Sequence, residues 1–133
     1  VNLAGHITIE DWAILEGMVA VQQFIRIGNH AFIAGASLVR KDVPPFVKAA
    51  REPLSYVGIN SVGLRRRGFS QEKINEIHEI YRHIYLKGYN VSQALAVIEA
   101  NMPVTDERDE ILSFIQSSTR GIMRGFSGSR EKE

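Results

Sequence analysis

Few side chains in this sequence could do chemistry, and they fall into two groups. The sequence has four histidines, the residue type whose ordinary pKa lies closest to neutral pH. A run of arginines, Arg65–Arg67, carries planar guanidinium groups that suit phosphate oxygens. There is no cysteine, which excludes disulfides and thiolate chemistry. The candidate chemistry is therefore proton transfer by histidine and phosphate binding by arginine.

Neither group is decisive by its residue types alone. His78 and His83 are spaced so that they do not share one helix face as metal ligands would, and we predict no metal site. An arginine run is more often a solvated basic patch than a ligand site. The net charge is +1 and no aromatic stacking platform is evident, so nucleic-acid binding is disfavoured.

A sixfold repeat of branched aliphatic residues must position these side chains. The repeat occupies seven consecutive positions: Leu3, Ile9, Leu15, Val21, Ile27, Ile33 and Val39. Turn-tolerant residue types follow two places later in most hexads. One inward aliphatic residue for each short strand is typical of a parallel β-helix. If three hexads form a triangular coil, Leu3, Val21 and Val39 stack in one internal column.

The same register makes further predictions. Gly17 should lie under Gly35, and Trp12 under His30. The hexads make little more than two coils, too few to be stable without neighbouring repeats, and the first coil would expose an unpaired parallel edge. Because the sequence begins inside the repeat with Val1 and without methionine, we expect the C-terminal part of a longer protein.

The apolar period changes after the repeat. In DVPPFV, residues 42–47, two prolines remove ladder donors and predict the end of strand pairing. Helices are expected to begin at Ser70, at Ser92, and at Thr105 or Asp106. No apolar run reaches the roughly 18 residues of a membrane span. The predicted division is β-helix coils, an extended basic connection, a three-helix domain and a flexible tail: 1–47, 48–69, 70–126 and 127–133.

Five segments then occur in an order found in a known family: LAGHITI, GMVAVQQF, DVPPFV, GLRRRGFS and STRGI. They resemble the C-terminal half of bacterial UDP-N-acetylglucosamine O-acyltransferases, which start lipid A synthesis. The resemblance runs from residue 2 to about residue 124. Hexads alone would indicate a wide superfamily of acyltransferases, whereas GLRRRGFS followed by three helices is more specific.

The resemblance implies a homotrimer with left-handed coils and active sites between neighbouring subunits. It implies transfer of an (R)-3-hydroxyacyl group from acyl carrier protein to the 3-hydroxyl of UDP-N-acetylglucosamine, in the cytoplasm and without a cofactor. The family's general base is a histidine in an HIAHD-like motif that should lie shortly before Val1. No histidine of this chain matches it.

The resemblance also assigns roles to residues around the acyl group. Gly5 matches the glycine whose N–H faces the thioester oxygen as an oxyanion donor. His6 and Gln23 match residues that contact substrate, and Gln22 stands where many relatives have a histidine. Glutamine donates and accepts hydrogen bonds but cannot titrate, so proton transfer at this position is not expected. Gly35 matches the residue that limits acyl-chain length, and a glycine there implies a long chain of the hydroxymyristoyl class.

At the nucleotide end, Asn60, Arg66 and Arg67 match residues that bind the uridine diphosphate. Relatives can place an acidic residue two positions after the asparagine, where this chain has Val62. A basic surface for the acidic carrier protein is expected from four residues: Arg82, Lys87, Arg120 and Arg124. Two alternatives stay open, namely an inert trimerising structural fragment of such an enzyme, and another acyltransferase of the hexapeptide-repeat class.

Overall fold

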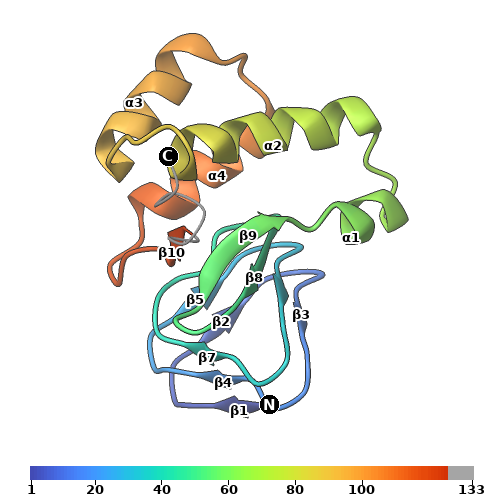
Figure 1. The fold of residues 1–133 in the computed structure, drawn as a ribbon, viewed down its shortest axis with the longest axis vertical. Coiled ribbons are helices and arrows are strands. Elements are labelled where there is room, and N and C mark those ends of the chain that lie inside the picture. The colour runs from blue at the N-terminus through green and yellow to red at the C-terminus, as the bar shows by residue number, and fades with distance from the viewer. Residues whose placement is uncertain (126–133) are drawn as a thin grey trace.

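The computed structural model describes residues 1–125, which form two layers. Stacked coils of short strands make the lower layer in Figure 1, and helices lie above and beside them. The chain begins in the coil farthest from the long helices (Figure 1). One hydrophobic core runs through both layers, since Ile27 and Ile33 of the coils and Ile77 and Ile111 of the helices are fully buried.

Short strands build the coils as the sixfold repeat predicts. They are β1 (Asn2–Leu3), β2 (Thr8–Ile9), β3 (Ile14–Leu15), β4 (Ala20–Val21), β5 (Arg26–Ile27), β6 (Phe32–Ile33) and β7 (Leu38–Val39). The pairs β1–β4, β2–β5, β3–β6 and β4–β7 are all parallel. Leu3, Val21 and Val39 share one register column. The predicted β-helix is confirmed, and its coils are left-handed.

A two-residue turn separates consecutive strands and forms each corner of the coil. The second residue of five turns has a positive φ, between 61° and 70°: Trp12, Met18, Phe24, His30 and Ala36. None of these is a glycine, and the turn-tolerant types that the repeat displays stand one position earlier. A non-glycine residue at positive φ is uncommon. In three of these turns, at Phe24, His30 and Ala36, the N–H of this residue donates to a carbonyl of the coil below.

The prolines of DVPPFV shorten the next coil but do not end strand pairing, which corrects the sequence-based prediction. β6 pairs in parallel with β8 (Val47–Ala50), and Ile27 forms a parallel bridge with Val43. The backbone of Pro45 lies against Gly28, where an added Cβ would be 2.5 Å from the proline nitrogen. Gly28 is therefore required by the close approach of Pro45.

The connection over 48–69, predicted as extended, contains a hairpin and a helix. β8 runs antiparallel to β9 (Ser55–Ile59), and α1 (Ser61–Arg66) follows. β10 (Arg124–Gly125) pairs in parallel with β9, which gives one wall the strand order β10-β9-β8-β6-β3. α1 escapes sequence analysis because it is short, contains Gly63 and shows no apolar period.

Three longer helices follow, and two of them begin where the sequence predicts. α2 (Gln71–Tyr85) is capped by Ser70, whose hydroxyl accepts from the N–H three residues later. α4 (Asp106–Gln116) is capped in the same way by Thr105. In both cases the cap satisfies a backbone donor that the first helical turn leaves free.

The remaining helix, α3 (Val91–Asn101), begins earlier than predicted. Its cap is Asn90 and not Ser92, which lies inside the first turn. Asn90 accepts from the N–H of Gln93, whose side chain accepts from the N–H of Asn90. This reciprocal pair is a capping box, which satisfies two backbone donors and outweighs a single serine cap.

Buried hydroxyl groups seat α2 on the coils. The hydroxyl of Tyr81 donates to the carbonyl of Pro45 at 2.6 Å, and that of Tyr85 donates to the carbonyl of Met123 at 2.8 Å. Both rings stack with Tyr56 of β9. The proline-containing segment is therefore covered by α2.

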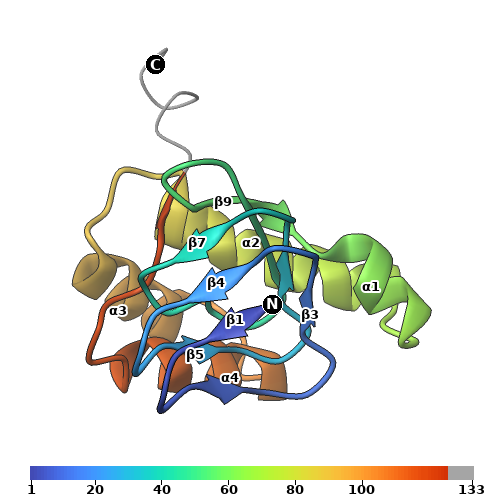
Figure 2. The same cartoon turned by 90° about the horizontal axis from the view of Figure 1, so that it is seen from below.

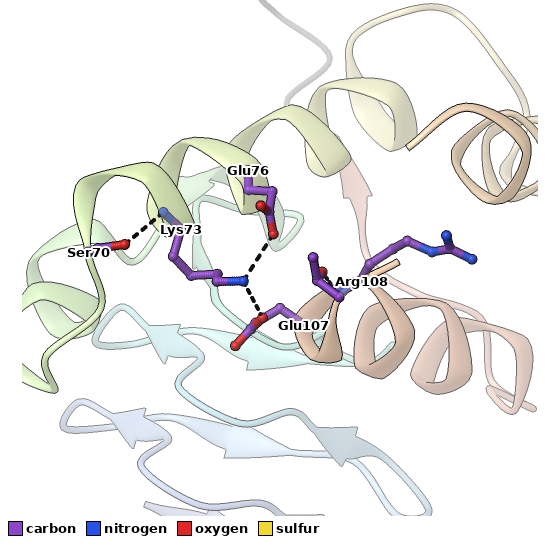
Figure 3. A network of polar contacts seen from close by, with 6 residues as sticks. Ser70, Lys73, Glu76, Glu107 and Arg108 are labelled. Carbon is purple, nitrogen blue, oxygen red and sulfur yellow. Dashed lines mark hydrogen bonds and ion pairs between the residues drawn. The ribbon is translucent and has the colours of Figure 1, made fainter. Parts of the chain in front are cut away.

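An ion-pair network joins α2 to α4, as Figure 3 shows. The ammonium group of Lys73 lies 3.0 Å from Glu107 and 3.2 Å from Glu76. Hydrogen bonds to Glu107 and then to Glu76 raise the pKa of Lys73 above its ordinary value. Because the network lies at the surface, it orients the helices more than it stabilises them.

Polar contacts fasten the segment after α4 to the β2–β5 wall. The guanidinium of Arg26 donates to the hydroxyl of Ser117 at 2.8 Å and lies over the Phe114 ring. The buried carboxylate of Asp42 accepts from the N–H of Arg26 and from the hydroxyl of Ser118. This clasp fixes the start of the STRGI segment against the coils.

The predicted tail, 127–133, lies outside the described residues. Within residues 1–125, the helices are all too short or too polar to span a lipid bilayer.

Candidate functional site

The candidate residues lie at three different corners of the coil. In chain order, the first corner holds residues 5–6 and 23–24, the second 11–12 and 29–30, and the third 17–18 and 35–36. Figure 2 looks at the coils from the end where the chain begins, with β1, β4 and β7 one behind the other along one wall. One subunit therefore does not gather all the predicted residues into one site.

The first corner brings together Gly5, His6, Gln22 and Gln23, all of them exposed. Within residues 1–125 the Gly5 N–H has no acceptor, so it is available to a ligand. A Cβ on Gly5 would lie 3.2 Å from Nε2 of Gln23, so the absence of a side chain lets Gln23 lie over this backbone. The His6 imidazole stacks on the Phe24 ring, with centroids 5.8 Å apart.

Sequence analysis missed Phe24 and assigned Arg120 only to the expected carrier-protein surface. The Arg120 guanidinium lies 5.3 Å from the centroid of the Phe24 ring, at this corner. A pocket of about 600 Å³ opens here, lined by His6, Thr8 and Arg120 among others. The STRGI motif marked Arg120, but no sequence pattern places the end of the chain beside residues near its start.

The third corner holds Gly35, stacked over Gly17 as predicted. The Gly35 N–H donates to the carboxylate of Glu16 at 3.0 Å. A Cβ on Gly35 would lie 3.2 Å from the Gly17 carbonyl oxygen, a tight contact with the coil below. Met18 is 81% exposed at the same corner, so an apolar side chain lies next to the open glycine surface.

At the second corner, Asn60 ties α1 to the coils. Its Oδ1 accepts from the N–H of Gly63 and caps α1, and its Nδ2 donates to the His30 carbonyl at 2.9 Å. The side chain is buried and both ends of its amide are engaged. Asn60 therefore fixes where α1 begins relative to the second corner.

α1 carries Arg66 and, at its end, Arg67 to the second corner. A pocket of about 320 Å³ between the helix and the corner is lined by both arginines, Trp12, His30 and Asn60. The guanidinium of Arg66 also lines a neighbouring pocket and has no hydrogen-bond or ion-pair partner in the described part of the chain. Two guanidinium groups at one pocket, with N–H edges free, are an arrangement that suits phosphate.

Trp12 and His30 occupy stacked positions, as predicted, but their rings have different partners. The His30 ring packs against Phe46 and Phe69, at 5.8 and 5.1 Å between centroids. The Trp12 ring lies under the guanidinium of Arg67. Burial, and then the charge of Arg67, lower the pKa of His30 below its ordinary value, so this imidazole is neutral at pH 7.

The expected basic surface is partly neutralised. Arg82 and Lys87 both lie near the carboxylate of Glu79, at 3.4 and 3.7 Å. Arg120 lies at the first corner, and Arg124 lies in β10. Among residues 1–125, no three histidine or carboxylate side chains cluster as a metal site would need.

Comparison with known proteins decides the family. Residues 42–123 match the family described as UDP N-acetylglucosamine O-acyltransferase, domain 2. The chain belongs to this family. Among its relatives is the acyl-[acyl-carrier-protein]–UDP-N-acetylglucosamine O-acyltransferase of Myxococcus xanthus, 41% identical over 118 residues, which are 89% of this chain and 46% of that protein. The enzyme of the same name from Janthinobacterium sp. is 43% identical over 127 residues, which are 92% of this chain and 48% of that protein.

Solved structures of the UDP-N-acetylglucosamine acyltransferase family agree with the fold. The Francisella novicida enzyme superposes with a TM-score of 0.89 at 41% identity, over 96% of this chain and 47% of that one. The Bacteroides fragilis enzyme superposes with a TM-score of 0.87 at 48% identity, over 89% of this chain and 46% of that one. The resemblance drawn from the five motifs is confirmed, and the chain spans just under half the length of these relatives.

Proposed function

We propose that the protein carrying this chain, here called the parent protein, transfers an (R)-3-hydroxyacyl group from acyl carrier protein to the 3-hydroxyl of UDP-N-acetylglucosamine in the cytoplasm. One observation carries the proposal: Arg66 and Arg67 present guanidinium groups to one pocket beside the second corner. A diphosphate offers oxygens to both. Relatives covering this whole region are named as acyltransferases of that nucleotide sugar.

The first corner is proposed to hold the reacting thioester. As the sugar hydroxyl attacks, negative charge develops on the thioester oxygen, and the free N–H of Gly5 can donate to it. One such donor is typically worth about 10²–10³ in rate. His6, Gln22 and Gln23 lie exposed at the same corner, with Gln23 next to Gly5, and are proposed to contact substrate by hydrogen bonds.

The third corner is proposed to set acyl-chain length. Gly35 presents no side chain there, and the exposed thioether of Met18 adds apolar surface beside it. An acyl chain lying along this corner is not blocked at Gly35, which supports a long donor of the hydroxymyristoyl class.

A homotrimer is proposed because the three corners cannot meet within one subunit. In a threefold assembly, one corner of a subunit faces a different corner of its neighbour, so acyl and nucleotide groups are held by two chains. Apolar side chains on the coil walls support such contacts, since Ile14 is 48% and Leu38 is 38% exposed. Acidic acyl carrier protein is proposed to contact Arg120 and Arg124, because Arg82 and Lys87 are already paired with Glu79.

The general base is proposed to lie in the part of the parent protein that this chain does not span. General base catalysis typically contributes about 10²–10⁴ in rate, and no histidine here matches the family's base. We would assay acyl transfer by the parent protein and by residues 1–133 alone, and measure the mass of each in solution. The parent protein is expected to transfer and the 133 residues are not.

Two results would contradict this proposal in different ways. Rapid transfer by residues 1–133 would place the base within the chain and point to His6. A parent protein that folds as a trimer but transfers nothing would favour the inert structural module.

A further inference from the structure

Trp12 is a large aromatic side chain in a position that does not favour one. It stands at the second corner with φ 62°, a conformation uncommon for bulky residues. Its side chain is 55% exposed, so burial in the core does not account for it. The other turn positions of this kind hold methionine, phenylalanine, histidine and alanine, so the backbone there does not require an indole.

The indole face of Trp12 holds a cation. The Cζ atom of Arg67 lies 3.6 Å from the centroid of the indole, well within cation–π range. In the part of the chain that the structure describes, the Arg67 guanidinium makes no ion pair and no hydrogen bond. Among the described residues, the contact that holds this exposed guanidinium is therefore the aromatic face of Trp12.

A stacked guanidinium keeps its binding edge free. Stacking engages the flat face, whereas the N–H donors point outward in the plane of the group. The neighbouring Arg65 shows the opposite arrangement, because its Nε and Nη2 both donate to the side-chain oxygen of Gln71 at 3.3 and 3.1 Å. Arg67 is therefore held in place with its N–H donors unused, whereas two N–H donors of Arg65 are engaged by Gln71.

We propose that Trp12 is a positioning residue that holds the Arg67 guanidinium, donors outward, at the pocket where the nucleotide diphosphate binds. The inference rests on the proposed function, since it assigns Arg67 to that diphosphate. In this role Trp12 acts through Arg67, and the double-mutant cycle below separates this from a direct contact with the ligand, since Trp12 also lines the pocket. Fixing the guanidinium in advance removes part of the ordering cost that a flexible arginine would meet on binding.

The test uses the parent protein and the substitution Trp12→Met, because Met18 occupies the equivalent turn position at φ 62° and shows that the backbone accepts methionine. A half-exposed cation–π contact predicts a rise of about two- to fivefold in KM for UDP-N-acetylglucosamine. kcat and the KM for acyl carrier protein thioester should not change. Trp12→Phe keeps an aromatic face for Arg67, so its KM for UDP-N-acetylglucosamine should rise less than that of Trp12→Met.

A double-mutant cycle decides whether Trp12 acts through Arg67. In an Arg67→Ala background, Trp12→Met should have no further effect on KM. Arg65→Ala is the matched control and should leave KM unchanged.

Three results for the KM of UDP-N-acetylglucosamine would overturn the inference. Trp12→Met could raise this KM as much in the Arg67→Ala background as in the wild type, or leave it unchanged in the wild type. Trp12→Phe and Trp12→Met could also raise it equally. Failure of the proposed function looks different, because the wild-type parent protein would then show no saturable use of UDP-N-acetylglucosamine.

Discussion

Replacing Asn60 should destabilise α1 and the second corner together. Asn60→Ala removes the acceptor that caps α1, which typically costs about 1 kcal/mol. It also leaves the His30 carbonyl without the donor that lies 2.9 Å away, and an unpaired buried acceptor costs about 1–3 kcal/mol. The free energy of unfolding should therefore fall by about 2–4 kcal/mol.

Two further substitutions separate these contributions. Asn60→Ser keeps a capping oxygen and loses the donor to His30, so only the loss of about 1–3 kcal/mol should remain. Asn60→Asp keeps the cap but turns a carboxylate oxygen toward the His30 carbonyl, so it should be worse than serine at pH 7 and improve as pH falls.

The assay is urea unfolding of the parent protein at fixed protein concentration, with hydrogen exchange at the amides of 61–66. Exchange in α1 should accelerate most in Asn60→Ala. If Asn60→Ala left both unfolding and exchange unchanged while nucleotide affinity fell, the positioning role would be wrong and Asn60 would be a direct ligand contact.

Three other perturbations test separate parts of the structure. Gly28→Ala places a Cβ 2.5 Å from the Pro45 nitrogen and should destabilise the parent protein by about 1–3 kcal/mol in urea unfolding. Gly17→Ala is the matched control, because a Cβ there has nothing within 4 Å. Equal urea midpoints for the two variants would refute the packing argument. Gly35→Met should shift acyl transfer toward shorter donors, assayed with a series of chain lengths in a variant checked for folding, and an unchanged profile would make Gly35 a turn residue only. Burial lowers the pKa of His30 below 6.5, so the stability it contributes is present above that pH and is lost as pH falls through the lowered value. The gap in urea midpoint between pH 7.5 and pH 5 should narrow in His30→Gln, and an unchanged gap would show that His30 does not titrate in this window.

The coils were predictable because their signal is a period. An inward aliphatic at every sixth position fixes which residues stack, and Leu3, Val21 and Val39 fall in one column as that spacing requires. The period also placed Gly5 and Gly35 at corners. It could not show that Ala36, the residue after Gly35, takes the uncommon positive φ and donates its N–H to the Gly17 carbonyl, because that hydrogen bond depends on the coil below.

The remaining parts of the fold and site depend on contacts that sequence spacing does not encode. The prolines predicted an end to pairing, yet Gly28 makes room for Pro45 and the coil continues. Trp12 meets Arg67, and Phe24 meets Arg120, across long stretches of chain. The family resemblance pointed to the arginines, but only the fold shows which of them keep their donors free.

The central claim is that the second corner binds the diphosphate of UDP-N-acetylglucosamine, and calorimetric titration of the parent protein with that nucleotide sugar tests it most directly. Arg66 has a free guanidinium at the pocket, whereas the guanidinium of Arg65 is bound to Gln71. Losing a charge-assisted hydrogen bond costs about 1.5–3 kcal/mol, so Arg66→Ala should weaken binding by roughly 10- to 150-fold. Arg65→Ala should bind as the wild type does. Equal affinity for wild type and Arg66→Ala would contradict the claim and return the arginines to a solvated basic patch.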